Sequence, residues 1–278
     1  MAIVGNQTKL SNVLWPVLAW AVAILFFFPI FWMVFTSFKT DADAVKPEFL
    51  FSFTPTLENY ANMTENYDYW RFAINSVITA SFATLFALVV GVPAAYAMAF
   101  NPTKRTKDVL VWMLSTKMLP AAAVLYPMTF LTKNYLTIFD THFLIILVLC
   151  LINLPIVIWM LFTYFKEIPR EIIEASKMDG VTTWGEIKDI LLPLAWGGLA
   201  STALLCFIFC WNEAYWTVRL TTTEAATLSK LIEGNRAPEG LFFGRLSAVS
   251  TAAVGPIVVL GWFCQKQLVK GLTFGAVK

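Results

Sequence analysis

Two ionisable side chains follow long stretches that carry no charge, and they are the first candidates for chemistry. Lys117 follows the apolar run 109–116, and Glu213 follows the uncharged run 194–212. If these runs are membrane helices, ionised groups within them are costly and are usually functional. At 1.5 Å per helical residue, Lys117 lies about 12 Å and Glu213 about 28 Å from the same membrane face, which argues against a pair. We expect Glu213 to reach the outer interface, or to meet Arg219 or Lys230.

Further polar and aromatic side chains in the same apolar stretches suit a polyhydroxylated ligand. The amides of Asn153 and Asn212 can hydrogen-bond to hydroxyl groups, and the ring of Trp211 can stack on the carbon face of such a molecule. The alternative is packing, because polar side chains join membrane helices and tryptophan favours the membrane interface. With Lys117 and Glu213, these three residues are the candidate substrate-pathway residues.

The residues needed for several other chemistries are missing from the sequence. The chain has one histidine, His142, and its four cysteines lack metal-ligand spacing. We therefore expect no catalytic and no metal site. No Gly-x-x-x-x-Gly-Lys-[Ser/Thr] phosphate-binding loop is present, so the chain should bind no ATP and no other cofactor itself. A net charge of only +2 argues against nucleic acid as a partner.

The composition indicates that these residues are held by membrane helices. Of 278 residues, 58% are hydrophobic and 14% are charged, with a mean hydropathy of +0.68. That much apolar surface must face lipid, and helices satisfy their backbone hydrogen bonds there. The sequence predicts an all-α integral membrane protein with six transmembrane helices in one domain, residues 1–278. The predicted spans are residues 13–36, 74–100, 109–132, 143–164, 194–218 and 246–264, and Pro120 with Pro127 should bend the third around a cavity.

The distribution of lysine and arginine in short loops predicts the orientation. Residues 101–108 hold three basic side chains, whereas residues 133–142 hold one. Because basic loops stay on the cytoplasmic side, both termini and residues 165–193 are predicted to be cytoplasmic. Residues 38–73 and 220–245 then become periplasmic segments of a multi-pass protein in a bacterial inner membrane.

The cytoplasmic loop 165–193 has the features of two short helices joined by a turn. Pro169 suits a first helical turn, and Gly180 after Asp179 suits a left-handed helix end. Thr183 and Glu186 have capping-box spacing, which predicts the start of the second helix. The small side chains in the first helix would let a partner approach the backbone closely.

The spacing within this loop resembles the EAA loop of ABC importer permeases, which is Glu-Ala-Ala, three residues, Gly, nine residues, Ile, one residue and Leu-Pro. Every interval fits, with serine in place of the second alanine. The residues that carry the match are Glu174, Ala175, Ser176, Gly180, Ile190, Leu192 and Pro193. The loop and its flanks resemble the carbohydrate-uptake, maltose-type branch. Other strings, such as Lys-Arg-Thr-Lys-Asp at 104–108 and Trp-Asn-Glu-Ala at 211–214, resemble the sorbitol and mannitol permeases.

The resemblance implies the type I ABC importer permease fold and a coupling mechanism. In that family the loop forms a coupling helix that docks on an ATPase subunit, which binds the ATP and Mg²⁺. Carried over, the ATPase-coupling residues would be Glu174, Ala175, Ser176, Asp179, Gly180, Leu192 and Pro193. The implied partners are a second, homologous permease in a heterodimer, two ATP-binding subunits and a periplasmic solute-binding protein. The implied substrate is a sugar alcohol, sugar or small glycoside; the alternative is an ion-coupled secondary transporter or a channel subunit.

Overall fold

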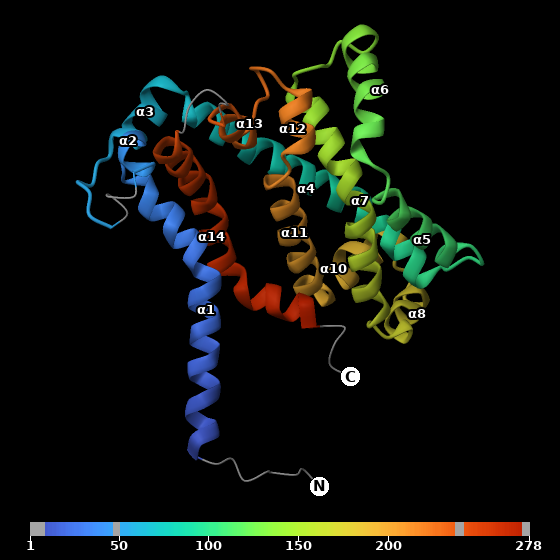
Figure 1. The fold of residues 1–278 in the computed structure, drawn as a ribbon. Helices are drawn as coiled ribbons and strands as arrows, with labels where there is room; N and C mark the ends of the chain where they lie inside the picture. The colour runs from blue at the N-terminus through green and yellow to red at the C-terminus, as the bar shows by residue number, and fades with distance from the viewer. Residues whose placement is uncertain (1–8, 47–50, 237–241, 274–278) are drawn as a thin grey trace. The chain divides into compact units, whose positions relative to one another are not determined.

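The computed structural model describes residues 9–46, 51–236 and 242–273, and every regular element in these ranges is a helix (Figure 1). The chain divides into two compact units, one of residues 1–67 with 234–254, the other of residues 68–233 with 255–278. The elements are α1 Lys9–Ser37, α2 Asp41–Ala44, α3 Glu58–Asn66, α4 Tyr69–Phe100, α5 Thr106–Thr116, α6 Ala121–Asn134, α7 His142–Lys166, α8 Arg170–Met178, α9 Thr183–Gly185, the π-helical turn η2 Glu186–Leu191, α10 Leu192–Leu194, α11 Trp196–Trp211, α12 Tyr215–Leu220, α13 Leu228–Gly234 and α14 Phe243–Thr273.

The first unit holds α1 to α3 and the first part of α14. The apolar window of α1 is not buried at all within the chain, as expected for a helix that faces lipid or another subunit. Polar contacts fix the segment after α1. Asn59 Nδ2 donates to the carbonyl oxygens of Ser37 at 3.0 Å and Lys39 at 2.6 Å. Arg245 at the start of α14 forms a salt bridge with Asp41 at 3.7 Å.

The second unit is built on α4, α7 and α11, which pack on one another (Figure 1). Small residues on α4, such as Ala83 and Ala87, are fully buried against large α7 side chains such as Leu149 and Leu161. Small residues let membrane helices approach closely and gain van der Waals contact. A side chain at Gly198 on α11 would meet the ring of Tyr164 on α7, with the nearest ring atom 2.4 Å from the new Cβ.

Gly198→Ala should therefore destabilise the α7–α11 contact by roughly 1–3 kcal/mol, the usual cost of overpacking. The ring cannot move aside easily, because the clash includes Cγ, close to the Tyr164 backbone. Gly197→Ala is the matched control, since a Cβ there meets nothing within 4 Å and alanine favours a helix by about 1 kcal/mol. Thermal unfolding of the purified chain in detergent measures both. Equal midpoints for the two variants would contradict the close approach.

The spans predicted from hydropathy are only partly continuous helices. In the described residues, four helices are long and apolar enough to cross a membrane, or up to six if each of two bent pairs is one span. The predicted span 109–132 is bent, as expected from Pro120: α5 and α6 meet at 83° around residues 117–120 and are not one continuous helix. Pro120 has no N–H to continue a helix and restricts the residue before it.

The predicted span 194–218 is also interrupted. It begins after a bend of 86° between the Thr183–Leu194 stretch and α11, and α11 ends at Trp211. The short helix α12 follows, and the Glu213 carboxylate accepts a hydrogen bond from the backbone N–H of Trp216 at 2.9 Å. This contact caps a free N–H at the start of α12, so it favours a new helix over continuation of α11.

Candidate functional site

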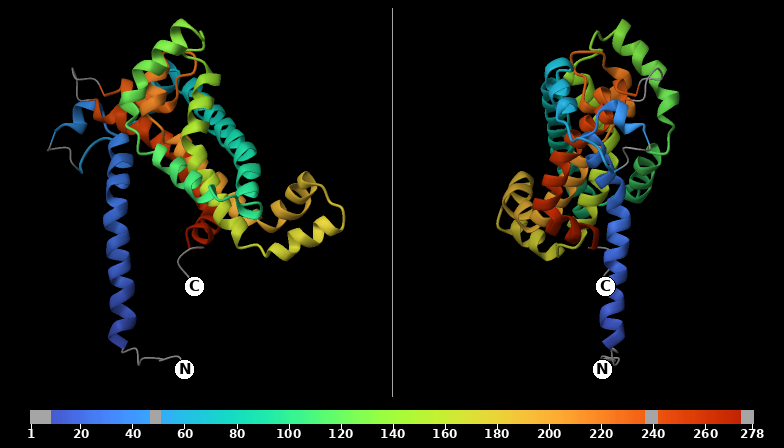
Figure 2. Two further views of the ribbon diagram at one scale, coloured as in Figure 1. Left: turned by 90° about the vertical axis from the view of Figure 1, so that its right-hand side faces the viewer. Right: turned by 60° about the vertical axis from the view of Figure 1, so that its left-hand side comes forward.

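The loop after α7 folds as a helical hairpin in which α8 is the first arm (Figure 2). The helix ends in a Schellman motif: Val181 N–H donates to Ser176 O, and Gly180 N–H donates to Lys177 O, both at 3.1 Å. Gly180 has φ +78°, and a Cβ there would meet no atom within 4 Å. Glycine is needed at this position for its backbone conformation and not for space. The predicted left-handed helix end at Gly180 is confirmed.

The two faces of α8 differ in exposure. Ile173 and Ser176 are buried, and Ser176 Oγ donates to Ile173 O at 2.8 Å. Glu174, Ala175 and Asp179 are exposed, and neither carboxylate forms a hydrogen bond or ion pair in the described part of the chain. The exposed face therefore presents the Glu174 carboxylate beside Ala175, with Asp179 also exposed at the helix end, while the serine of the same motif belongs to the inner face.

Large apolar side chains are exposed on the same hairpin. Met178 is 88% exposed, Trp184 is 67% exposed and Ile172 is 38% exposed. Such residues beside charged groups are typical of a protein interaction surface. In the second arm Leu192 is half-buried and Pro193 is exposed in the short helix α10.

The second arm of the hairpin begins one residue earlier than the sequence indicated. Thr182, not Thr183, caps α9, with its hydroxyl accepting from Gly185 N–H at 3.3 Å. The predicted capping box was wrong because the Glu186 side chain turns inward. It is 1% exposed and accepts a hydrogen bond from the hydroxyl of Tyr96 on α4, itself 3% exposed. This buried contact joins the hairpin to a core helix of the second unit.

Removing one partner of this contact should destabilise the hairpin. Glu186→Ala leaves the Tyr96 hydroxyl buried without an acceptor, at a cost of about 1–3 kcal/mol. Tyr96→Phe in the same chain should remove most of that penalty, because both polar groups are then gone. A double-mutant cycle by denaturant unfolding in detergent measures the coupling. Additive effects of the two substitutions would show that the contact contributes nothing.

A cavity of about 310 Å³ lies where the α5–α6 elbow faces α7 and α12. Its lining is mainly apolar, with Lys117, Thr116 and Trp216 among the lining residues. The Lys117 ammonium donates to Asn153 Oδ1 on α7 at 3.4 Å. The bent third span thus lines a cavity, and Lys117 is its charged side chain.

Two contacts around Lys117 and Asn153, with Phe209 and Cys210, were not predicted from the sequence. The Lys117 ammonium lies 5.6 Å from the centre of the Phe209 ring, a cation–π distance. Asn153 is 3% exposed and also donates to Leu149 O at 2.9 Å and to Cys210 Sγ at 3.3 Å. No spacing rule relates residues of different helices, so these contacts had no sequence signal.

Of the five pathway candidates, Lys117 alone is among the residues that line this cavity. The Trp211 ring stacks on Phe207 at 5.8 Å between centroids, and Asn212 Nδ2 donates to the backbone oxygen one turn earlier at 2.9 Å. Glu213 caps α12 as described above. Neither suggested partner pairs with it in the described residues: Arg219 lies over the Tyr215 ring, and Lys230 donates to a backbone oxygen. The structure brings Lys117 into contact with Asn153. Glu213 interacts with Lys117 electrostatically but forms no salt bridge with it among the described residues, and Trp211 and Asn212 have other partners.

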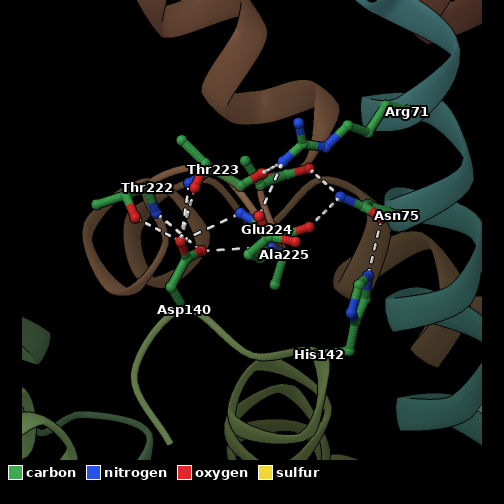
Figure 3. A network of polar contacts seen from close by, with 9 residues as sticks. Arg71, Asn75, Asp140, His142, Thr222, Thr223, Glu224 and Ala225 are labelled. Atoms are coloured by element: carbon green, nitrogen blue, oxygen red, sulfur yellow. Dashed lines mark hydrogen bonds and ion pairs between the residues drawn. The ribbon is translucent and has the colours of Figure 1, made fainter.

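A polar network lies at the start of α4 and of α7, and no pattern in the sequence indicated it (Figure 3). The Asp140 carboxylate accepts hydrogen bonds from the backbone N–H groups of residues 222–225, at 2.9 to 3.3 Å, and from the hydroxyls of Thr222 and Thr223. Partial burial opposes ionisation of this carboxyl, but these hydrogen bonds outweigh it and hold the Asp140 pKa well below its usual range.

Side chains of α4 hold the same segment from the opposite side. Asn75 Nδ2 donates to Glu224 O and Ala226 O, both at 2.9 Å, and Asn75 Oδ1 is 2.8 Å from His142 Nε2 (Figure 3). Arg71 donates to Thr223 O and lies 3.8 Å from the Glu224 carboxylate. His142, the single histidine, is therefore a structural residue that orients an amide.

The fold and the hairpin define a transport component of the membrane, and comparison with known proteins gives its family. Residues 91–272 match the family described as the binding-protein-dependent transport system inner membrane component, so the chain belongs to that family. It is a multi-pass inner-membrane permease subunit of the ABC importer type and a transport component rather than an enzyme.

Similar proteins cover the whole chain. The probable ABC transporter permease protein y4oR of Sinorhizobium fredii is 32% identical over 100% of both chains. The trehalose transport system permease protein SugB of Mycobacterium tuberculosis is 32% identical, over 95% of this chain and 97% of its own length. The trehalose/maltose transport system permease protein MalG of Thermococcus litoralis is 31% identical, over 98% and 99%.

A solved structure has the same fold. One chain of a bacterial ABC transporter involved in the import of the acidic polysaccharide alginate superposes with a TM-score of 0.75. The match covers 96% of this chain and 99% of that chain at 21% sequence identity. The predicted ABC importer permease fold is confirmed.

Proposed function

We propose that this chain couples ATP hydrolysis by partner subunits to the passage of a small carbohydrate across the bacterial inner membrane. The observation that carries the proposal is the α8 hairpin. It presents Glu174 and Ala175 on an exposed face, while Ser176 and Glu186 fix the hairpin from its buried side. Because the outer face of the hairpin is exposed and its inner face is held by the core of the second unit, a protein docked on the outer face can transmit force through it.

In this mechanism, ATP and Mg²⁺ bind to two ATPase subunits, and this chain binds no cofactor. Closure of the ATPase dimer would push α8, and the Tyr96–Glu186 contact would pass the movement to α4. The hairpin and both termini lie in the cytoplasm, whereas residues 38–73 and 220–245 face a periplasmic solute-binding protein. A second, homologous permease completes a heterodimer that encloses the solute pathway.

We propose a sugar, sugar alcohol or small glycoside as the substrate. The names of two relatives specify trehalose or maltose. The preference for a polyol such as sorbitol or mannitol rests on sequence strings alone. Lys117 lines the cavity and is the side chain best placed to hydrogen-bond to hydroxyl groups, with the buried Asn153 accepting a hydrogen bond from it. The alternative, an ion-coupled transporter or channel, has no support from the family match.

The docking proposal is tested with a photo-cross-linking residue in place of Ala175 in the assembled complex. Position 175 is exposed on α8, so we expect a cross-linked product with the ATPase subunit. The same residue in place of Asn134, exposed at the end of α6, is the control and should give none. Cross-linking at position 134 but not at 175 would refute the proposed docking face.

A further inference from the structure

A second cavity, of about 390 Å³, lies at the end of the second unit that carries the hairpin. It forms where the end of α4, the start of α5, the end of α7 and the start of α8 come together. Four basic residues contribute to its lining, namely Lys104, Lys107, Lys166 and Arg170. No acidic residue does.

The positive charge of this cavity has no counter-charge within the described chain. None of the four basic side chains forms a salt bridge there; the Lys166 ammonium lies 5.4 Å from the Phe162 ring, and Arg170 donates to Ala99 O at 3.4 Å. The acidic neighbours Asp108 and Glu167 are exposed and do not line the cavity. The cavity therefore attracts an anion.

The rest of the lining selects the kind of anion. Val111, Trp159 and Phe162 provide an apolar wall, and Val111 is 55% exposed beside Trp112, which is 66% exposed. These residues belong to α5 and α7, so the apolar surface continues from the cavity along membrane helices. A soluble anion would use only the basic residues, whereas a phospholipid uses them for its phosphate and the apolar wall for its acyl chains.

We propose that this cavity binds the headgroup of an anionic phospholipid, such as phosphatidylglycerol, from the cytoplasmic leaflet. The assignment to the cytoplasmic leaflet rests on the proposed function, which places the hairpin in the cytoplasm. Because Arg170 is the first residue of α8, a bound phosphate would also steady the helix that docks on the ATPase.

Lipid titration of the purified full-length chain in detergent, read by native mass spectrometry, tests the proposal. Phosphatidylglycerol should bind more tightly than zwitterionic phosphatidylethanolamine. K104Q/K107Q should raise the Kd for phosphatidylglycerol by roughly 30-fold, about fivefold for each basic residue. K46Q/K133Q removes the same charge from residues that do not line the cavity and should change the Kd by less than about twofold. K104R/K107R keeps the charge and should bind as the native chain does.

Each other outcome has a definite meaning. Equal affinities in the native chain and K104Q/K107Q, or equal losses in K46Q/K133Q, would overturn the site. Displacement of the lipid by millimolar inorganic phosphate would show a free-anion site and overturn the lipid assignment. The measurement needs neither the ATPase nor transported solute, so its failure would leave the importer proposal intact.

Discussion

Glu174→Gln is expected to reduce solute-stimulated ATP hydrolysis by the assembled importer at least tenfold. The native carboxylate is exposed and forms no hydrogen bond or ion pair in the described chain, so its loss should not affect folding. In the docked complex it would be buried against a basic group of the ATPase. Truncating one partner of such a buried pair costs about 2–5 kcal/mol, and each 1.4 kcal/mol is tenfold in affinity.

The matched control for this prediction is Glu171→Gln, which removes the same charge from the same helix. Glu171 lies in the first turn of α8, one turn before the matching motif, and is also exposed. Hydrolysis should stay within about twofold of the native rate, because an exposed charge contributes little. Equal effects of the two substitutions would mean that the charge of α8 matters and that the motif position does not.

Asp140→Ala is expected to lower the free energy of unfolding by about 2–4 kcal/mol. Each hydrogen bond to a charged group contributes about 1.5–3 kcal/mol, but the N–H groups freed by the substitution regain some hydrogen bonds to water. The carboxylate accepts hydrogen bonds from the backbone N–H groups of residues 222–225. Asp68→Asn is the control, because Asp68 is exposed, has a similar positive φ and caps no helix with its side chain. It should change stability by less than about 0.5 kcal/mol.

The pH dependence of the same site follows from the lowered Asp140 pKa. A carboxyl whose pKa is lower in the folded state stabilises the fold fully above its unfolded pKa, about 3.9. That stabilisation is lost as the pH falls from about 4 through the lower, folded pKa. Thermal unfolding midpoints of Asp140→Ala and native chains in detergent should therefore differ most at pH 7, and the difference should narrow as the pH falls below about 4. A constant difference over this range would contradict ionised Asp140 as the anchor.

Hydropathy and local backbone rules predicted the features that depend on neighbouring residues. The apolar runs gave the long helices α1, α4, α7 and α14, because an apolar stretch of spanning length has few alternatives in lipid. Gly180 was recognisable as a helix end because few residues other than glycine adopt a positive φ there.

The features that sequence reasoning missed depend on distant partners. Glu186 has the spacing of a capping box, but its carboxylate accepts a hydrogen bond from the hydroxyl of Tyr96, which lies 90 positions earlier in the sequence. Asp140 is separated by 82 to 85 positions in the sequence from the residues whose N–H groups donate to it. Local spacing cannot predict such contacts, because the packing of several helices brings the residues together. The bend at residues 117–120 was indicated by Pro120, but its size was not, because its apolar flanks have the pattern of one continuous span.

ATP-driven solute uptake into proteoliposomes measures the coupling most directly. The vesicles would hold this chain with its partner permease, with or without the ATPase subunits, and with solute-loaded binding protein on the side opposite the ATP. We predict uptake only when the ATPase and ATP are both present, with little uptake for Glu174→Gln. Uptake by the permeases alone, or uptake unaffected by removal of ATP, would contradict the coupling role of the α8 hairpin.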